Sequence, residues 1–192
     1  MFYILDQNAE IEGSAAVNDL PESIDPLDWI RGKIMPAPPK DLVLNLSEAS
    51  GDGRGDIIDG LITLYSDKLK KVLTDFGIDN IQYFPVKLRD PKDGTLERGY
   101  WIANIIGLIE CVDKENSTLI PLPSGIGNDL GPFQIMASKT KGVPLFRLAE
   151  APTLVIVTEK LVDHLIASEI CGVRARDTKT EFRGALPPSA PW

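Results

Sequence analysis

The chain has 192 residues, a formal net charge of −8 and 43% hydrophobic residues, a composition typical of a globular protein and not of a disordered or fibrous one. At this length one continuous core needs no disulfide or metal to support it. The acidic excess repels phosphate backbones and anionic membranes, so it disfavours nucleic-acid and membrane binding and favours a basic protein partner.

Cysteine usage and the first residues bear on the cellular compartment. The only two cysteines, Cys111 and Cys171, each lie in an apolar run, which favours two buried, reduced thiols and a cytoplasmic protein. The start of the chain has no basic segment followed by an apolar one, so we expect no signal peptide. The longest apolar run, residues 100–109, is too short to span a bilayer.

The first half of the chain predicts two strands, at Phe2–Leu5 and Leu42–Leu46, separated by a proline-containing acidic loop. Residues 51–56 are a glycine-rich connector. The apolar spacing that follows predicts a helix beginning near Asp56 and continuing, from an N-cap at Ser66, to a stop at Gly77.

The second half is richer in strand patterns. Residues 81–88 alternate and lead into the turn 90–94, so we expect a hairpin whose return strand, residues 100–112, forms the middle of the sheet. Thr158 is the predicted N-cap of a second helix reaching about Ser168. The remaining strand candidates are residues 119–122, 133–136, 145–148 and 153–157.

These elements predict an α+β fold in which a mainly antiparallel sheet, built chiefly from the second half, is covered by a few helices. We expect one domain over residues 1–192. Within it, residues 1–50 form a possible N-terminal lobe, residues 51–183 the sheet-and-helix core, and residues 184–192 a tail.

The glycine loop Gly51–Gly55 has two interpretations. A glycine loop between a strand and a helix is how dinucleotide folds hold a pyrophosphate. The spacing here differs from the usual fingerprint, and Asp52 and Asp56 would face an incoming phosphate. A connector without a ligand is therefore favoured over a nucleotide or small-ligand site.

No catalytic or metal site is predicted. His164 is the only histidine, which disfavours zinc, and apolar surroundings make Cys111 and Cys171 more plausible as core residues than as nucleophiles. We therefore expect no catalytic residue, cofactor or metal. Tyr100-Trp101 and Phe146-Arg147-Leu148 are either strand packing with a satisfied arginine or anchors of an interface, and packing is favoured.

An acidic segment with one tryptophan is the predicted partner-binding surface. Its side chains suit a basic protein, and Trp29 is expected to be exposed beside them, although an ordinary solvated loop explains the same residues equally well. The segment consists of Asp19, Glu22, Asp25, Asp28 and Trp29.

Several apolar runs occur in a familiar order: Met1–Leu5, Tyr100–Asn104 with Cys111–Asp113, Pro144–Leu148, and Leu154–Thr158 leading through Leu161 to Ile170–Val173. In this order the chain resembles the bacterial polymorphic-toxin immunity proteins grouped as immunity family eleven, formerly a domain of unknown function. The resemblance implies a non-enzymatic cytoplasmic protein that binds and neutralises a cognate toxin encoded beside it. It implies no catalytic residues.

Two alternatives remain open beside an immunity protein. The first is an enzyme or small-ligand protein that uses the Gly51–Gly55 loop. The second is a structural or regulatory subunit that forms a homo-oligomer through a free edge of the strand expected at residues 100–112.

Overall fold

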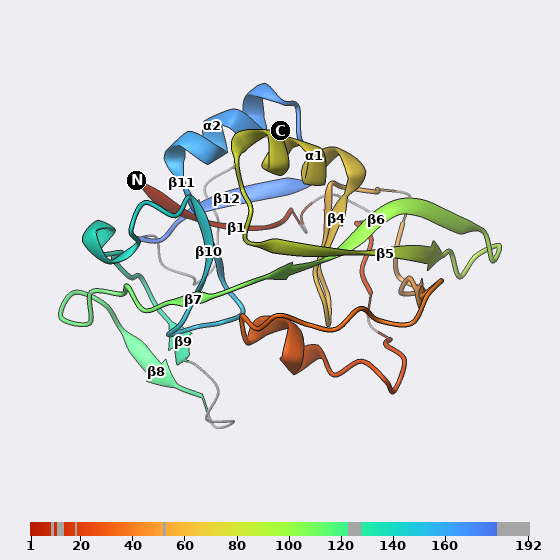
Figure 1. Ribbon diagram of the computed structural model, residues 1–192, viewed down its shortest axis with the longest axis horizontal. Helices are drawn as coiled ribbons and strands as arrows, with labels where there is room; N and C mark the ends of the chain where they lie inside the picture. Colours follow the sequence, from red (N-terminus) through yellow and green to blue (C-terminus); the bar gives the residue numbers. More distant parts are fainter. Residues whose placement is uncertain (9, 11–13, 18, 52, 123–127, 180–192) are drawn as a thin grey trace.

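The computed structural model describes residues 1–8, 10, 14–17, 19–51, 53–122 and 128–179 (Figure 1). These residues form two five-stranded sheets, a two-stranded hairpin and two α-helices. From the N-terminus the elements are β1 (Phe2–Gln7), the 3-10 helix η1 (Pro26–Ile30), β2 (Val43–Asn45), β3 (Ile57–Ile58), β4 (Leu64–Ser66), α1 (Asp67–Phe76), β5 (Ile81–Arg89), β6 (Leu96–Ile105), β7 (Leu108–Ile109), β8 (Leu119–Pro121), β9 (Asn128–Leu130), the 3-10 helix η2 (Ala137–Lys139), β10 (Leu145–Leu148), β11 (Val155–Thr158), α2 (Glu159–Ala167) and β12 (Val173–Asp177).

The predicted α+β class is confirmed. The first sheet has the order β12-β1-β11-β10-β7 and the second the order β2-β5-β6-β4-β3, while β8 and β9 pair separately. Pairing is antiparallel except between β10 and β7 and between β2 and β5. The sheets are thus mainly antiparallel, as the strand spacing predicts.

The first sheet joins the two ends of the described chain. Tyr3 of β1 faces Val157 of β11 on one side and Asp177 of β12 on the other, so the N-terminal strand lies inside the sheet. The prediction of a sheet built chiefly from the second half holds for this sheet, apart from β1. It is wrong for the second sheet, whose strands β2, β3, β4 and β5 come from the first half. Residues 171–172 lead directly into β12, a strand that is not predicted from the sequence.

The hairpin β5–β6 confirms the prediction for residues 81–94 and supplies the longest strands of the second sheet. Its return strand ends at Ile105, not at Val112, because Gly107 has a φ of +90° and its N–H donates to the carbonyl of Gly32. Beyond this turn β7 joins the first sheet. Residues 100–105 offer no free edge for oligomerisation, since β6 lies between β5 and β4.

The helix predicted from Asp56 is wrong over its first turns. Residues 57–58 and 64–66 instead form the antiparallel strands β3 and β4. The side chains of Ile57 and Leu64 are buried in different cores, on opposite faces of the second sheet. A strand covered on both faces has no polar side, and its apolar run resembles helical spacing.

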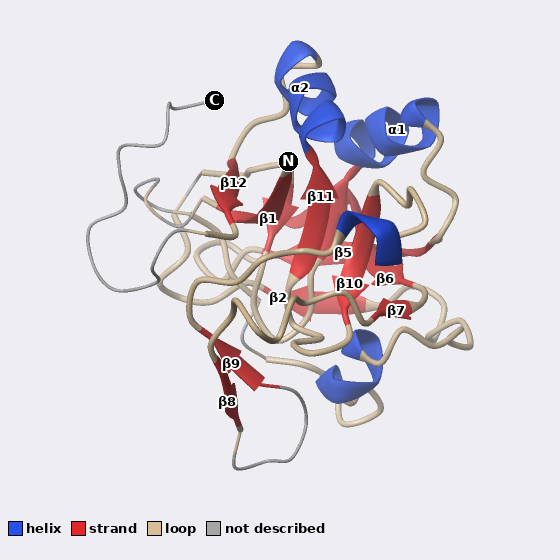
Figure 2. Ribbon diagram, turned by 90° about the vertical axis from the view of Figure 1, so that its left-hand side faces the viewer, coloured by secondary structure: helices blue, strands red, loops and turns tan. Residues whose placement is uncertain are grey.

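The prediction of a helix capped by Ser66 is confirmed as α1. The Ser66 side chain accepts a hydrogen bond from the Leu69 N–H, and Gly77 ends the helix with a φ of +96°. The second helix, α2, begins after Thr158 as predicted, but the Thr158 side chain makes no capping hydrogen bond. In Figures 1 and 2 the two helices lie side by side at one end of the sheets.

Strand alternation separates the interior into three apolar clusters. In the first sheet Leu5 faces the cluster shared with α1, α2 and the second sheet, whereas its neighbour Ile4 faces the opposite cluster with Phe133 and Phe146. In the second sheet Ala103 faces the central cluster and Ile102 faces a third one with the N-terminal segment. Both sheets are therefore covered on both faces.

Three details complete the fold. Residues 133–136 do not form the predicted strand and contribute only an isolated bridge at Ile135, whereas residues 128–130, which were not predicted, pair with β8. The predicted tail, residues 184–192, lies outside the described residues. Within the described part of the chain, neither helix is long and apolar enough to cross a membrane.

Candidate functional site

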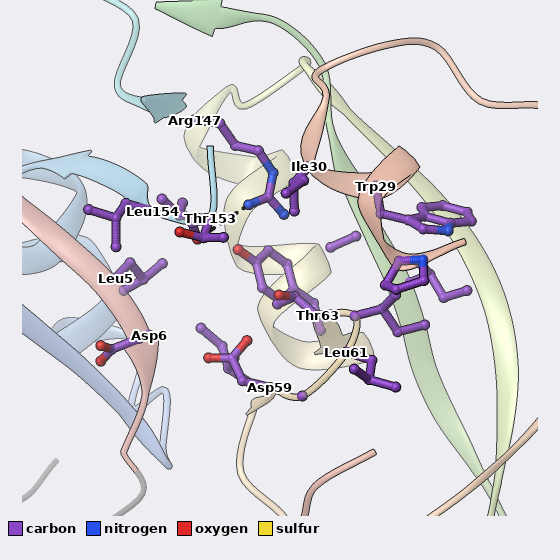
Figure 3. A pocket seen from close by; sticks show the side chains of 18 of the residues that line it. Leu5, Asp6, Trp29, Ile30, Asp59, Leu61, Thr63, Arg147, Thr153 and Leu154 are labelled. Carbon is purple, nitrogen blue, oxygen red and sulfur yellow. Dashed lines mark hydrogen bonds between the residues drawn. The ribbon is translucent and has the colours of Figure 1, made fainter. Parts of the chain in front are cut away.

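A pocket of about 370 Å³ lies between the two sheets and is bordered by η1 (Figure 3). Its walls come from strands of both sheets, since β1, β10, β11 and β12 contribute on one side and β3, β4 and β6 on the other. Pockets of this size hold small molecules in many proteins. The polar and charged side chains among its lining residues are Asp6, Asp59, Thr63, Tyr65, Arg147, Thr153 and Arg176.

Arg147 of β10 is the buried cation of this pocket. Its side chain points into the cavity between Ile30 and Thr153 (Figure 3), and the residue is only 3% exposed. Nη1 donates to the carbonyl of Pro152 at 2.9 Å, but Nε has no partner within the described structure. Burial lowers the pKa of the Arg147 guanidinium.

Asp59 lies across the pocket from Arg147 (Figure 3). Its carboxylate accepts a hydrogen bond from the Gln7 N–H at 2.9 Å, and the Gln7 side chain in turn accepts from the Asp59 N–H at 2.9 Å. Burial raises the pKa of Asp59, which favours its neutral form. Arg147 appears in none of the ion pairs found between described residues, so Asp59 acts on it only at longer range.

Trp29 lines the same pocket from η1, and the prediction that it is exposed is wrong. The residue is 5% exposed and packs edge-on against Phe84 with ring centroids 5.6 Å apart. The Asp25 side chain caps η1 by accepting from the Leu27 N–H, which turns the indole inward. Trp29 therefore anchors the acidic segment to the core and is not available on the surface for contact with a partner.

The acidic residues of the predicted surface lie outside this buried indole. Asp19, Glu22 and Asp25 are exposed, and Asp28 is partly exposed, with its side chain 3.1 Å from Arg31. Asp19 belongs to a bridge with Asn45 of β2, which ties the segment to the second sheet. The segment is thus attached to the fold at its start and by η1 at its end.

The described residues of the Gly51–Gly55 loop, which leave out position 52, do not form a phosphate site at a helix N-terminus. The segment after it is β3, so no helix N-terminus faces the loop, contrary to the prediction. Arg54, its one cation, is engaged by Glu97 at 3.0 Å and Asp90 at 2.7 Å. Asp56 is buried and accepts a hydrogen bond from the Cys171 N–H.

The two cysteines differ, and the prediction of two buried thiols is wrong for Cys171. Cys111 is buried, and burial with the nearby Glu150 raises its pKa to about 12. Cys171 is exposed beside Asp56.

The only histidine, His164, packs against Phe76 in α1. Within the described residues no three His, Cys, Asp or Glu side chains are grouped for a metal.

Arg147 and Asp59 are not predicted as site residues from the sequence. The preferred interpretation of Phe146-Arg147-Leu148 as strand packing is right for Phe146 and Leu148, which are buried in the same cluster. It is wrong for Arg147, whose Nε is not satisfied. The available signal was an arginine within an apolar strand. The position of Asp59 across the pocket depends on the packing of distant segments and cannot be predicted from the local sequence.

The fold and these sites define an α+β protein with a buried pocket and an acidic surface segment. A comparison with known protein families gives a match to the immunity protein family Imm11 over residues 7–180, and the chain belongs to this family. A comparison with curated proteins gives no match.

Proposed function

We propose that this chain is a cytoplasmic immunity protein that neutralises a cognate bacterial toxin by binding it, without catalysis of its own. The observation that carries the proposal is the family match, which extends over nearly all described residues. An immunity role requires a surface complementary to the toxin and no reactive group. We further propose that the chain acts as a single domain.

The proposed docking surface is the acidic segment around η1, formed by Asp19, Glu22, Asp25 and Asp28. Exposed carboxylates in a chain with a net charge of −8 accelerate encounter with a basic partner and orient it. Among these residues only Asp28 has an ion-pair partner, Arg31. The segment therefore retains negative charge for a partner, and Trp29 below it keeps the backbone in place.

Charge reversal tests this surface. The variant Asp19→Lys/Glu22→Lys changes two exposed residues that neither cap η1 nor belong to an ion pair of the described structure. We expect the association rate constant for the catalytically inactive toxin to fall about tenfold at low salt, because steering by opposite charges is lost. Stopped-flow or surface plasmon resonance measurements give this rate.

The matched control is Asp129→Lys/Asp163→Lys, which reverses two exposed acids on β9 and α2. Both variants change the net charge from −8 to −4, since each replacement adds two charges. We expect the control to change the rate less than about twofold. Equal effects of the two variants would show that only the overall charge matters and would remove this segment from the proposal.

A further inference from the structure

The pocket between the sheets holds a buried cation without a matching anion. Arg147 is 3% exposed, and the Nε N–H finds no acceptor among the described residues. Buried guanidinium groups are normally paired, because an uncompensated charge in an apolar interior is costly. A ligand that brings an acceptor to Arg147 therefore recovers interaction that the protein alone does not make.

The other charged groups at the pocket do not fill this role. Asp6 is already bound by Arg174 and Arg176 of β12. Asp59 is the remaining acid, and its carboxylate is held by the Gln7 backbone instead of by Arg147. The guanidinium thus remains the group with an unused hydrogen-bond donor inside the cavity.

Aliphatic side chains form much of the remaining pocket wall and its rim, alongside the polar groups named above. Leu61 and Leu27 line the pocket and are 47% and 41% exposed, so they mark its side toward solvent. Figure 3 shows Leu61 at the side of the cavity remote from Arg147. Deeper walls are made by Leu5, Ile57, Ile102 and Leu154. A ligand that complements a guanidinium at one side and aliphatic walls beyond it has an anionic group at one end and an apolar body.

We propose that this pocket binds a small monocarboxylate with an apolar body, its carboxylate on the Arg147 guanidinium and its body against the aliphatic walls. A carboxylate suits a guanidinium because it accepts two parallel N–H bonds. A free small molecule is favoured over a protein segment, since Arg147 is only 3% exposed and lies in a pocket between two sheets. This site adjoins the proposed toxin surface, since η1 borders both, but the carboxylate proposal does not rest on toxin binding.

Calorimetric titration of the full chain tests the proposal. The probes are octanoate and 4-phenylbutanoate, which distinguish straight-chain from aromatic bodies, and octanol, which lacks the charge. We expect at least one carboxylate to bind at a single site and octanol to bind about tenfold more weakly than octanoate. Failure of both carboxylates to bind, or equal affinity for octanol and octanoate, would overturn the proposal.

Two variants locate the binding. Arg147→Met removes the guanidinium, keeps an unbranched side chain, and is expected to abolish the preference for carboxylate over alcohol. Because Arg147 also donates to the Pro152 carbonyl, a second variant leaves the guanidinium intact. Leu61→Glu places a negative charge at the rim and is expected to weaken carboxylate binding about fivefold by repulsion.

The matched control is Ile34→Glu, because Ile34 is 74% exposed and lies outside the pocket. We expect it to leave carboxylate affinity unchanged. Equal loss in Leu61→Glu and Ile34→Glu would contradict the assigned site, as would a retained carboxylate preference in folded Arg147→Met. Binding of a toxin-derived peptide through its C-terminal carboxylate, with no binding of the small acids, would assign the pocket to a protein partner and overturn the proposal.

Discussion

The orientation of two side chains in this protein is set by tertiary contacts and not by the residues next to them in the sequence. Trp29 and Arg147 both line the pocket, although Trp29 lies on η1 and Arg147 lies on β10. Neither orientation is visible in the local sequence. An indole among acidic residues resembles a surface anchor, and an arginine in an apolar strand resembles a satisfied core residue. Tertiary contacts determine that the indole is buried and that the arginine faces the pocket.

The burial of Trp29 changes what its truncation should do. We expect Trp29→Ala to lower the free energy of unfolding by about 3–5 kcal/mol, because the change removes a large side chain packed on Phe84 and leaves a cavity. Urea denaturation measures this loss. An unfolding free energy within about 1 kcal/mol of the parent chain would contradict the packing described for η1.

The two thiols should differ in reactivity. Cys171 is exposed, whereas Cys111 is buried with its pKa raised to about 12. We expect a thiol reagent at about pH 8 to modify one cysteine of the folded chain and the second only after denaturation. Peptide mapping identifies the modified residue. Modification of Cys111 in the folded chain would contradict its burial.

At the scale of elements, features set by local residues could be predicted from the sequence, whereas strands set by long-range pairing could not. The cap at Ser66, the stop at Gly77 and the turn at residues 90–94 could be predicted, because each depends on residues close in sequence. The strands β4 and β12 could not, since they pair with partners far away in the sequence, and β3 pairs only with β4. Apolar spacing over residues 57–65 fits a helix as well as doubly covered strands.

The two helix N-caps provide a matched comparison. Ser66 accepts a hydrogen bond from the Leu69 N–H and also bonds to Asp56, whereas Thr158 makes no capping bond. We expect Ser66→Ala to cost about 1–2 kcal/mol of unfolding free energy and Thr158→Ala less than about 0.5 kcal/mol. Chemical denaturation of both variants measures the difference. Equal losses would contradict the capping geometry of α1.

At the scale of the whole molecule, composition and the order of apolar runs predicted the class and the family, while the surfaces needed the fold. The acidic segment could be identified from sequence, because a cluster of carboxylates is a local feature. The pocket could not, since its walls join β1, β4 and β10 only after the sheets pack. Family membership gives a toxin-immunity role, and the docking surface remains our proposal.

The most direct test of the central proposal is titration of the chain with an inactive variant of the proposed cognate toxin, followed by co-expression with the active toxin. We predict a complex with a Kd of about 10⁻⁹ M, since immunity requires occupancy at low concentration, together with restored growth. Absence of a complex at micromolar concentrations, with toxicity unchanged by co-expression, would contradict the account.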